Sequence, residues 1–206
     1  TVPLMHKLFL GQIKSPQNVI VAKATLPILS NILIETQQDQ LRLTATDLDI
    51  GISCVIPVDV REHGAVTIPA KRFSDIVKEL PVDSVNITTK KNNQVNIETT
   101  LCQFKIMGLA REEFPKLPEF KDKEAIKLGQ GVLKEMLNLT SFAVSIDETR
   151  YILNGILFRI NKNNLTLVAT DGKRLAIIER KINYTAEKDV NIIVPVKTIH
   201  ELNRNL

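Results

Sequence analysis

An internal repeat is the feature that most constrains the fold of this chain. Three segments of the first half recur in the second half in the same order, offset by 124 or 126 positions: ILSNILI at 28–34 and ILNGILF at 152–158, ATD at 45–47 and 169–171, and IPAKRFSDIVKEL at 68–80 and VPVKTIHELNRNL at 194–206. Three matches in register predict a duplicated domain. Only the second copy continues with Gly172-Lys173-Arg174.

Each copy is predicted to begin with an amphipathic helix and to continue with strands. In the second copy Leu133, Met136, Leu137 and Thr140 share one helical face. Apolar strands are expected over 28–34 and 152–160, each followed by a strand in which alternate residues are apolar: Leu41, Leu43 and Ala45 in the first copy, and Leu165, Leu167 and Ala169 in the second.

A second helix is expected after another strand that ends in proline. Its predicted apolar face in the first copy consists of Phe73, Ile76, Val77 and Leu80. Its predicted solvent-exposed (wet) face consists of Ser74, Asp75, Lys78 and Glu79. The pattern indicates an α+β class in which two helices per domain pack on antiparallel sheets.

The first copy adds three predicted strands, at 84–90, 94–100 and 102–109, and a charged, proline-rich segment follows at 111–125. We therefore expect domains over 1–119 and 120–206. The second copy stops within its second helix, so we expect it to lack its last strands and the native protein to continue past Leu206.

The composition is that of a globular protein, with 44% hydrophobic and 24% charged residues among 206. It contains no apolar run near the ~20 residues of a membrane helix, and we predict a cytoplasmic protein. Cys54 and Cys102 each lie in an apolar run and are predicted to be buried thiols. The net charge of +4 is compatible with nucleic-acid binding but does not establish it.

Motifs for catalysis are absent from the sequence. It has no phosphate-binding glycine loop, and its three histidines have no metal-ligand spacing to other donors. Asp47 and Asp49 are predicted on the same side of a strand, where they either hold Mg²⁺ or end the strand and face water. The second copy has Gly172-Lys173 in place of Leu48-Asp49, so the acidic pair is not repeated. We predict no enzyme, no metal and no cofactor.

Five segments carry a specific resemblance: TLPILSNILIE, LTATDLDIGI, IPAKRFSDIVKELP, RYILNGILF and ATDGKRLA. They resemble the bacterial sliding clamps, the beta subunits of DNA polymerase III, from about Thr25 to Leu206. The resemblance implies three copies of one domain per chain, of which the third is absent here. It further implies that two chains close head to tail into a ring around duplex DNA, without catalysis. The implied partners are the polymerase alpha subunit, the clamp loader, and other polymerases and repair proteins.

The resemblance also implies a hydrophobic cleft in which short partner motifs dock. Residue by residue it assigns this cleft to Leu153, Thr170, Gly172, Lys173, Arg174 and Leu175. An apolar wall with a few cationic and backbone anchors suits an extended hydrophobic peptide. Position 173 is commonly His in the family and is Lys here. The alternative is an Asp-Gly turn with solvated basic residues. The rest of the cleft is expected past Leu206, so we expect this chain alone to bind such peptides weakly.

For DNA, the resemblance implies contacts by Lys23, Arg150 and Tyr151, while Ile152 replaces a frequent Tyr. Lys71, Lys134 and Lys197 at helix starts or on polar helix faces are further candidates, or else ordinary solvated lysines. The ring interface is predicted to use Arg72, Ile76, Leu80, Leu101, Gln103 and Ile106, with Ile76 and Leu80 alternatively in the core of their own domain.

Two other functions remain open from the sequence. One is a peptide-binding adaptor without a DNA function, built on the same duplicated fold. The other is a small metal- or nucleotide-dependent enzyme that uses the charged clusters at the strand ends. Retention on circular but not on linear DNA would separate a clamp from an adaptor.

Overall fold

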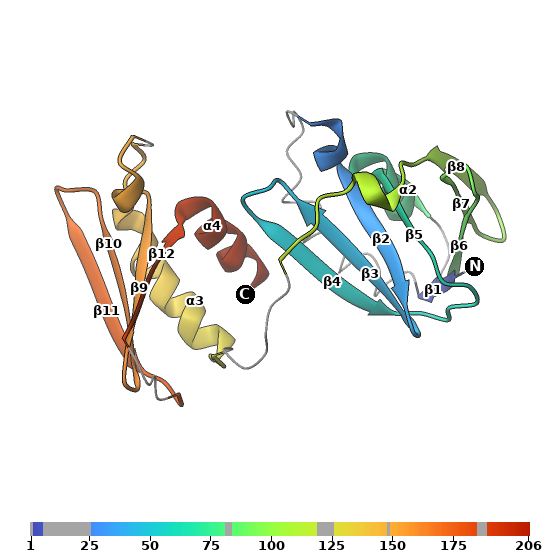
Figure 1. The fold of residues 1–206 in the computed structure, drawn as a ribbon. Coiled ribbons are helices and arrows are strands. Elements are labelled where there is room, and N and C mark those ends of the chain that lie inside the picture. The colour runs from blue at the N-terminus through green and yellow to red at the C-terminus, as the bar shows by residue number, and fades with distance from the viewer. Residues whose placement is uncertain (1, 6–25, 81–83, 119–125, 148, 185–188) are drawn as a thin grey trace. The chain divides into compact units, whose positions relative to one another are not determined.

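The computed structural model describes residues 2–5, 26–80, 84–118, 126–147, 149–184 and 189–206. The chain divides into two compact units, Thr1–Pro118 and Glu119–Leu206. Figure 1 labels the helices and strands of both units.

Both units contain the same four-stranded antiparallel sheet. In unit 1 the strands are β2 (Asn31–Gln37), β3 (Gln40–Thr46), β4 (Gly51–Pro57) and β5 (Ala65–Pro69), in the order β4-β3-β2-β5. In unit 2 they are β9 (Gly155–Asn161), β10 (Asn164–Thr170), β11 (Leu175–Lys181) and β12 (Val190–Pro195), in the order β11-β10-β9-β12. The equal order and matching bounds confirm the predicted duplication and the α+β class.

Helices begin directly after the prolines that end β5 and β12. They are α2 (Ala70–Glu79) in unit 1 and α4 (Val196–Asn205) in unit 2. Proline has no N–H to donate to a sheet but tolerates a helix start, which accounts for this change of structure. Unit 2 also contains α3 (Gln130–Asn138), which lies beside α4 on one face of the sheet (Figure 1). The corresponding first helix of unit 1 was predicted in a segment outside the described residues.

The predicted alternation of buried residues is confirmed on β10, whereas on β3 Thr44 and Thr46 are buried as well. Leu43 and Leu167 are fully buried on β3 and β10, as are Phe73 and Val77 on α2. Ser74, predicted on the wet face, is also fully buried, and that prediction is wrong. The reason is that side chains of two sheets and α2 form one continuous core in unit 1, which covers the helix over a wider arc than one apolar stripe.

The second sheet of unit 1 has the order β1-β6-β7-β8. It contains β1 (Val2–Met5) and the three strands predicted from the sequence, β6 (Ser84–Thr89), β7 (Gln94–Glu98) and β8 (Gln103–Met107). A bridge between Thr67 and Leu109 joins the two sheets. Asn31 Nδ2 donates to Thr67 Oγ1 (3.3 Å), and that hydroxyl donates to the Leu109 carbonyl (3.2 Å). A Cβ on the adjacent Gly108 would lie 2.3 Å from the Thr67 carbonyl oxygen, so only glycine fits there.

Several predicted boundaries are wrong. Residues 28–30 and 152–153, expected to begin strands, belong to 3-10 helices over Pro27–Ser30 and Tyr151–Leu153. The strands β4 and β11 were not predicted as separate elements, although both form hairpins with the preceding strand.

Cys54 lies on β4 but is only half-buried, and Cys102 precedes β8 and is half-buried as well.

Candidate functional site

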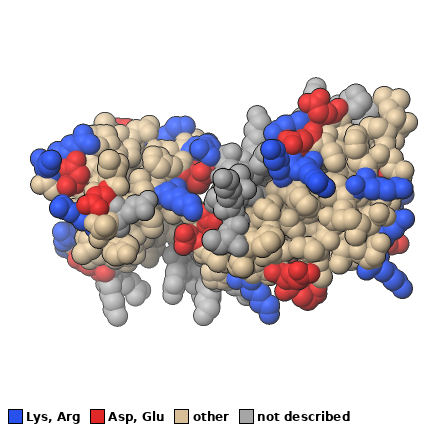
Figure 2. Space-filling model, turned by 90° about the horizontal axis from the view of Figure 1, so that it is seen from above, with Lys and Arg blue, Asp and Glu red and all other residues tan. Residues whose placement is uncertain are grey.

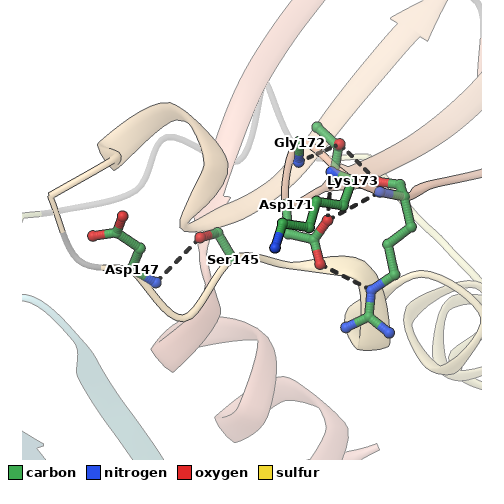
Figure 3. Close-up of polar contacts among 7 residues, drawn as sticks. Ser145, Asp147, Asp171, Gly172 and Lys173 are labelled. Atoms are coloured by element: carbon green, nitrogen blue, oxygen red, sulfur yellow. Dashed lines mark hydrogen bonds and ion pairs between the residues drawn. The ribbon is translucent and has the colours of Figure 1, made fainter.

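The Ala-Thr-Asp motif of the second copy, residues 169–171, lies at the end of β10 and begins the turn that leads into β11. Thr170 Oγ1 accepts the N–H of Gly172 (3.1 Å) and donates to the carbonyl of Arg174 (2.7 Å). Asp171 Oδ1 accepts the N–H groups of Lys173 (2.9 Å) and Arg174 (3.0 Å). Figure 3 shows the Asp171 carboxylate inside the turn, below Gly172 and Lys173. Threonine and aspartate are therefore repeated because their side chains close this turn.

The first copy makes the same turn with the same bonds. Thr46 Oγ1 accepts the N–H of Leu48 (3.1 Å) and donates to the Ile50 carbonyl (2.9 Å). Asp47 Oδ1 accepts the N–H groups of Asp49 (3.1 Å) and Ile50 (2.8 Å). The prediction that Asp47 and Asp49 lie on one side of a strand is therefore wrong, because both belong to the turn.

The third turn residue has a positive φ in both copies, and here the copies differ. Gly172 has φ +89° and Leu48 has φ +80°. Glycine adopts this region at no steric cost, whereas a residue with a Cβ is strained in it. The second turn then presents the cations Lys173 and Arg174, and the first presents an exposed leucine and Asp49.

The charges of the second turn are tied to the protein. Arg174 Nε lies 3.0 Å from Asp171 Oδ2, and its guanidinium carbon lies 5.7 Å from the centroid of the Phe142 ring. The backbone N–H of Lys173 is the largest cause that lowers the pKa of Asp171, and the N–H and guanidinium of Arg174 lower it further. The carboxylate consequently stays ionised and holds the arginine beside the aromatic ring.

Arg150 approaches the same turn from the loop before β9. Its Nη1 lies 3.7 Å from the position that a Cβ on Gly172 would take. Asp147 Oδ2 lies 3.4 Å from Arg150 Nε. The hydrogen bonds that Thr149 donates to Asp147, from its hydroxyl (2.6 Å) and its N–H (3.1 Å), lower the pKa of that carboxyl most, and Arg150 adds to them. Figure 3 shows Asp147 bonded to Ser145 on this loop.

The predicted cleft residues are thus brought together in part. Thr170, Gly172, Lys173, Arg174 and Leu175 lie on one turn, with Leu175 at 61% exposure. Leu153 is half-buried at the end of its 3-10 helix, on the loop that carries Arg150.

Sequence reasoning missed two features of this region. It assigned Arg150 to DNA alone, and it overlooked Phe142, which is 59% exposed beside Arg174. The predicted helical face extends to Thr140, but α3 ends at Asn138, and Phe142 lies in a separate 3-10 helix, Ser141–Ala143. An aromatic residue outside the predicted apolar face was the available signal.

The described candidates for DNA contact are exposed. Lys71 lies on α2, Lys134 on α3 and Lys197 on α4, and Tyr151 is 84% exposed. Lys23 lies outside the described residues. In the view of Figure 2, Lys and Arg are interspersed with Asp and Glu on each unit and do not form one continuous basic strip.

The six candidates for a ring interface divide into two groups. Arg72, Leu101 and Gln103 are exposed and Ile76 is half-buried, and Gln103 donates to Glu98 on the neighbouring strand. Leu80 and Ile106 are buried in the core of unit 1 itself, at 4% exposure each. The side chains of these two residues therefore support the domain from within.

Among the described residues, no group of three His, Cys, Asp or Glu side chains is arranged to hold a metal ion. None of the helices in the same part of the chain has the length and apolar character needed to cross a membrane.

Two family models match consecutive parts of the chain. Residues 4–118 match the N-terminal domain of the DNA polymerase III beta subunit, and residues 127–206 match the central domain of that subunit. The beta sliding clamp of Chlamydia muridarum is 36% identical over 192 residues, covering 93% of this chain and 52% of the relative. The beta sliding clamp of Staphylococcus aureus is 35% identical over 204 residues, covering 95% and 54%. The chain spans about half the length of these curated relatives.

Solved structures show the same fold. The DNA polymerase sliding clamp of Bacillus subtilis superimposes with a TM-score of 0.96 at 30% identity, over 100% of this chain and 56% of that chain. The DNA polymerase III subunit beta of Pseudomonas aeruginosa gives a TM-score of 0.92 at 30% identity, with the same coverage.

Proposed function

Because the chain belongs to the DNA polymerase III beta subunit family, we propose that its protein is a sliding clamp, a ring that encircles duplex DNA and keeps the replicative polymerase on its template. The observation that carries this proposal is the match of two consecutive clamp domains in the order and spacing of the internal repeat. The ring is a scaffold without catalytic activity of its own, and it acts in the cytoplasm.

A ring holds DNA by topology, so it needs neither base contacts nor tight binding to phosphates. The exposed Lys71, Lys134 and Lys197, on three different helices, are suited to weak, sequence-independent phosphate contacts. Lys23, Arg150 and Tyr151 are proposed to add contacts beside them. The net charge of +4 is modest, and cations are interspersed among anions. Both features favour a ring that slides along DNA over a protein that binds the phosphates tightly.

The turn between β10 and β11 is proposed to dock short hydrophobic motifs of partner proteins. The exposed Leu175 and the half-buried Leu153 offer apolar surface, and Arg174 is held in place by Asp171 and Phe142. Arg150 reaches the same turn, so we assign it to peptide docking as well as to DNA. The partners proposed for this site are the polymerase alpha subunit, the clamp loader, other polymerases and repair proteins.

The ring is proposed to close through the surface of unit 1 that carries α2 and the residues around β8. Arg72, Ile76, Leu101 and Gln103 have side chains that a second molecule can reach, and Leu101 is 74% exposed. Leu80 and Ile106 support this surface from the core of the unit.

The test is DNA synthesis on a primed single-stranded circle by the replicative polymerase and clamp loader, with the protein produced from its own gene. The wild-type protein should lengthen the products, and the Leu175→Ala variant should not. Ile177→Ala is the matched control, since Ile177 lies on the same strand with the same 61% exposure, and it should behave as wild type. Equal product lengths with and without the wild-type protein would refute the proposal.

A further inference from the structure

The residue that follows the turn is a leucine in unit 2 and a glycine in unit 1, where a leucine from a distant segment lies beside the glycine. Leu175 pairs with Thr170 across the turn of unit 2, and Gly51 pairs with Thr46 at the same position of unit 1. A Cβ on Gly51 would lie 2.9 Å from Cδ1 and 3.0 Å from Cδ2 of Leu117. Unit 1 therefore has a leucine side chain beside its turn as well, but Leu117 supplies it from the end of the unit.

The segment that carries Leu117 is held on unit 1. Arg111 Nε lies 2.5 Å from Glu35 Oε1, and Phe114 is buried at 5% exposure. Beyond Phe114 the described chain forms neither helix nor strand up to Pro118. Pro115 and Pro118 each restrict the residue before them to extended backbone. The segment Phe114–Pro118 therefore has the form of an extended peptide that loses little entropy when it docks.

The surroundings of the first turn suit such a peptide. Leu48 is 60% exposed at the tip of the turn, and it keeps a strained positive φ where the second copy has glycine. Strained residues that persist at a surface often mark binding sites. The turn also carries Asp47 and Asp49, and Lys116 precedes Leu117, so the turn and the segment have opposite charges.

We propose that the Thr46–Gly51 turn is a second docking site for a leucine-bearing extended peptide, and that Leu117 is its resident occupant. The chain thus fills this site itself, whereas the turn of unit 2 stays open to partners, with Leu175 at 61% exposure. The claim about partners rests on the proposed docking function of unit 2, whereas the occupancy by Leu117 does not.

The test uses the whole chain labelled with ¹⁵N, and a synthetic peptide with blocked ends and the sequence of residues 114–118, Phe-Pro-Lys-Leu-Pro. In the Leu117→Ala variant the amide signals of Leu48 and Gly51 should shift, and the peptide should move them back toward their wild-type positions. An effective concentration of about 1 mM keeps the resident segment docked even at an intrinsic Kd of that order, so the peptide is titrated through that concentration. The same peptide with alanine in place of its leucine should have no effect.

Lys116→Ala is the matched control variant, since it alters the neighbouring residue and keeps the leucine, and its Gly51 signal should stay near wild type. A double variant that combines Leu117→Ala with Gly51→Leu should not respond to the peptide, because the new side chain fills the site. Leu48 and Gly51 signals that ignore both the Leu117→Ala substitution and the peptide would overturn the proposal. A response confined to Gly172 would also overturn it while supporting docking at unit 2. A response at Gly51 supports the occupancy whether or not Gly172 responds, because the docking function of unit 2 is tested separately by Leu175→Ala in DNA synthesis.

Discussion

Adding one methyl group to Gly172 tests the account of the second turn. At φ +89° an L-residue is strained, and the nearest heavy atom to the new Cβ would be Arg150 Nη1 at 3.7 Å, an ordinary contact. The cost of Gly172→Ala therefore comes from the backbone alone. Left-handed backbone costs an L-residue about 1–2 kcal/mol, and the smaller entropy of the unfolded chain returns about 0.4–1 kcal/mol. We expect a net loss of about 1 kcal/mol in the free energy of unfolding of unit 2.

Thermal unfolding followed by circular dichroism measures this loss, and hydrogen exchange in β10 and β11 assigns the transition to unit 2. A loss of about 1 kcal/mol lowers the Tm of a domain of this size by about 4–8 °C. Gly131→Ala is the matched control in the same unit, because Gly131 lies within α3 with open space around its Cβ position. It should raise the Tm, since alanine is favoured over glycine in a helix by about 0.5–1 kcal/mol. Shifts of the same sign for the two substitutions would refute the reasoning.

Three other predictions concern single side chains. The pKa of Asp171 is lowered in the folded state, so the ionised carboxylate stabilises unit 2 above the ordinary pKa of an aspartate, and this stabilisation is lost as the pH falls through the folded pKa. The acid unfolding curves of wild type and Asp171→Asn should therefore converge at low pH. A difference in stability that stays constant with pH would contradict this. Burial raises the pKa of the Cys54 thiol to about 11. The rate at which iodoacetamide alkylates Cys54, measured by mass spectrometry, should therefore be low at pH 8 and rise steeply above pH ~10. Rapid alkylation at pH 8 would contradict this, because it would show an accessible thiolate. Thr67→Val leaves the buried amide of Asn31 without its acceptor and should cost about 1–3 kcal/mol in urea unfolding, whereas an unchanged midpoint would mean that the link between the sheets adds nothing.

Much of the fold could be predicted because the evidence for it is local and repeated. Alternate apolar residues predicted β3 and β10, and their duplication predicted two equivalent sheets. The prolines before α2 and α4 predicted where strand changes to helix, because proline restricts the backbone in the same way in every context.

The errors arose where contacts between distant segments decide the outcome. Ser74 is buried in a unit whose core joins residues of two sheets and α2, and no pattern within the helix encodes the second sheet. Residues 28–30 are as apolar as the strand that follows, yet they form a 3-10 helix, since an apolar run alone does not distinguish the two.

The candidate site was predictable in its residues but not in its contacts. The Thr-Asp phrase and the glycine after it could be identified from the sequence, since turn chemistry follows from residue type. Three contacts join segments that are far apart along the chain. They are the approach of Arg150 to Gly172, the stacking of Arg174 on Phe142 and the contact of Leu117 with Gly51. Only the folded structure brings them together.

The most direct test of the account is retention of the protein, produced from its own gene and loaded by its clamp loader, on a nicked circular plasmid during gel filtration in high salt. A ring should stay with the circular plasmid because its hold is topological, and it should be lost once a restriction enzyme linearises the same DNA. Equal retention on circular and linear plasmid would show ordinary electrostatic binding, and no retention on either would show an adaptor without a DNA function. Both results would contradict the proposal that these duplicated domains form a sliding clamp.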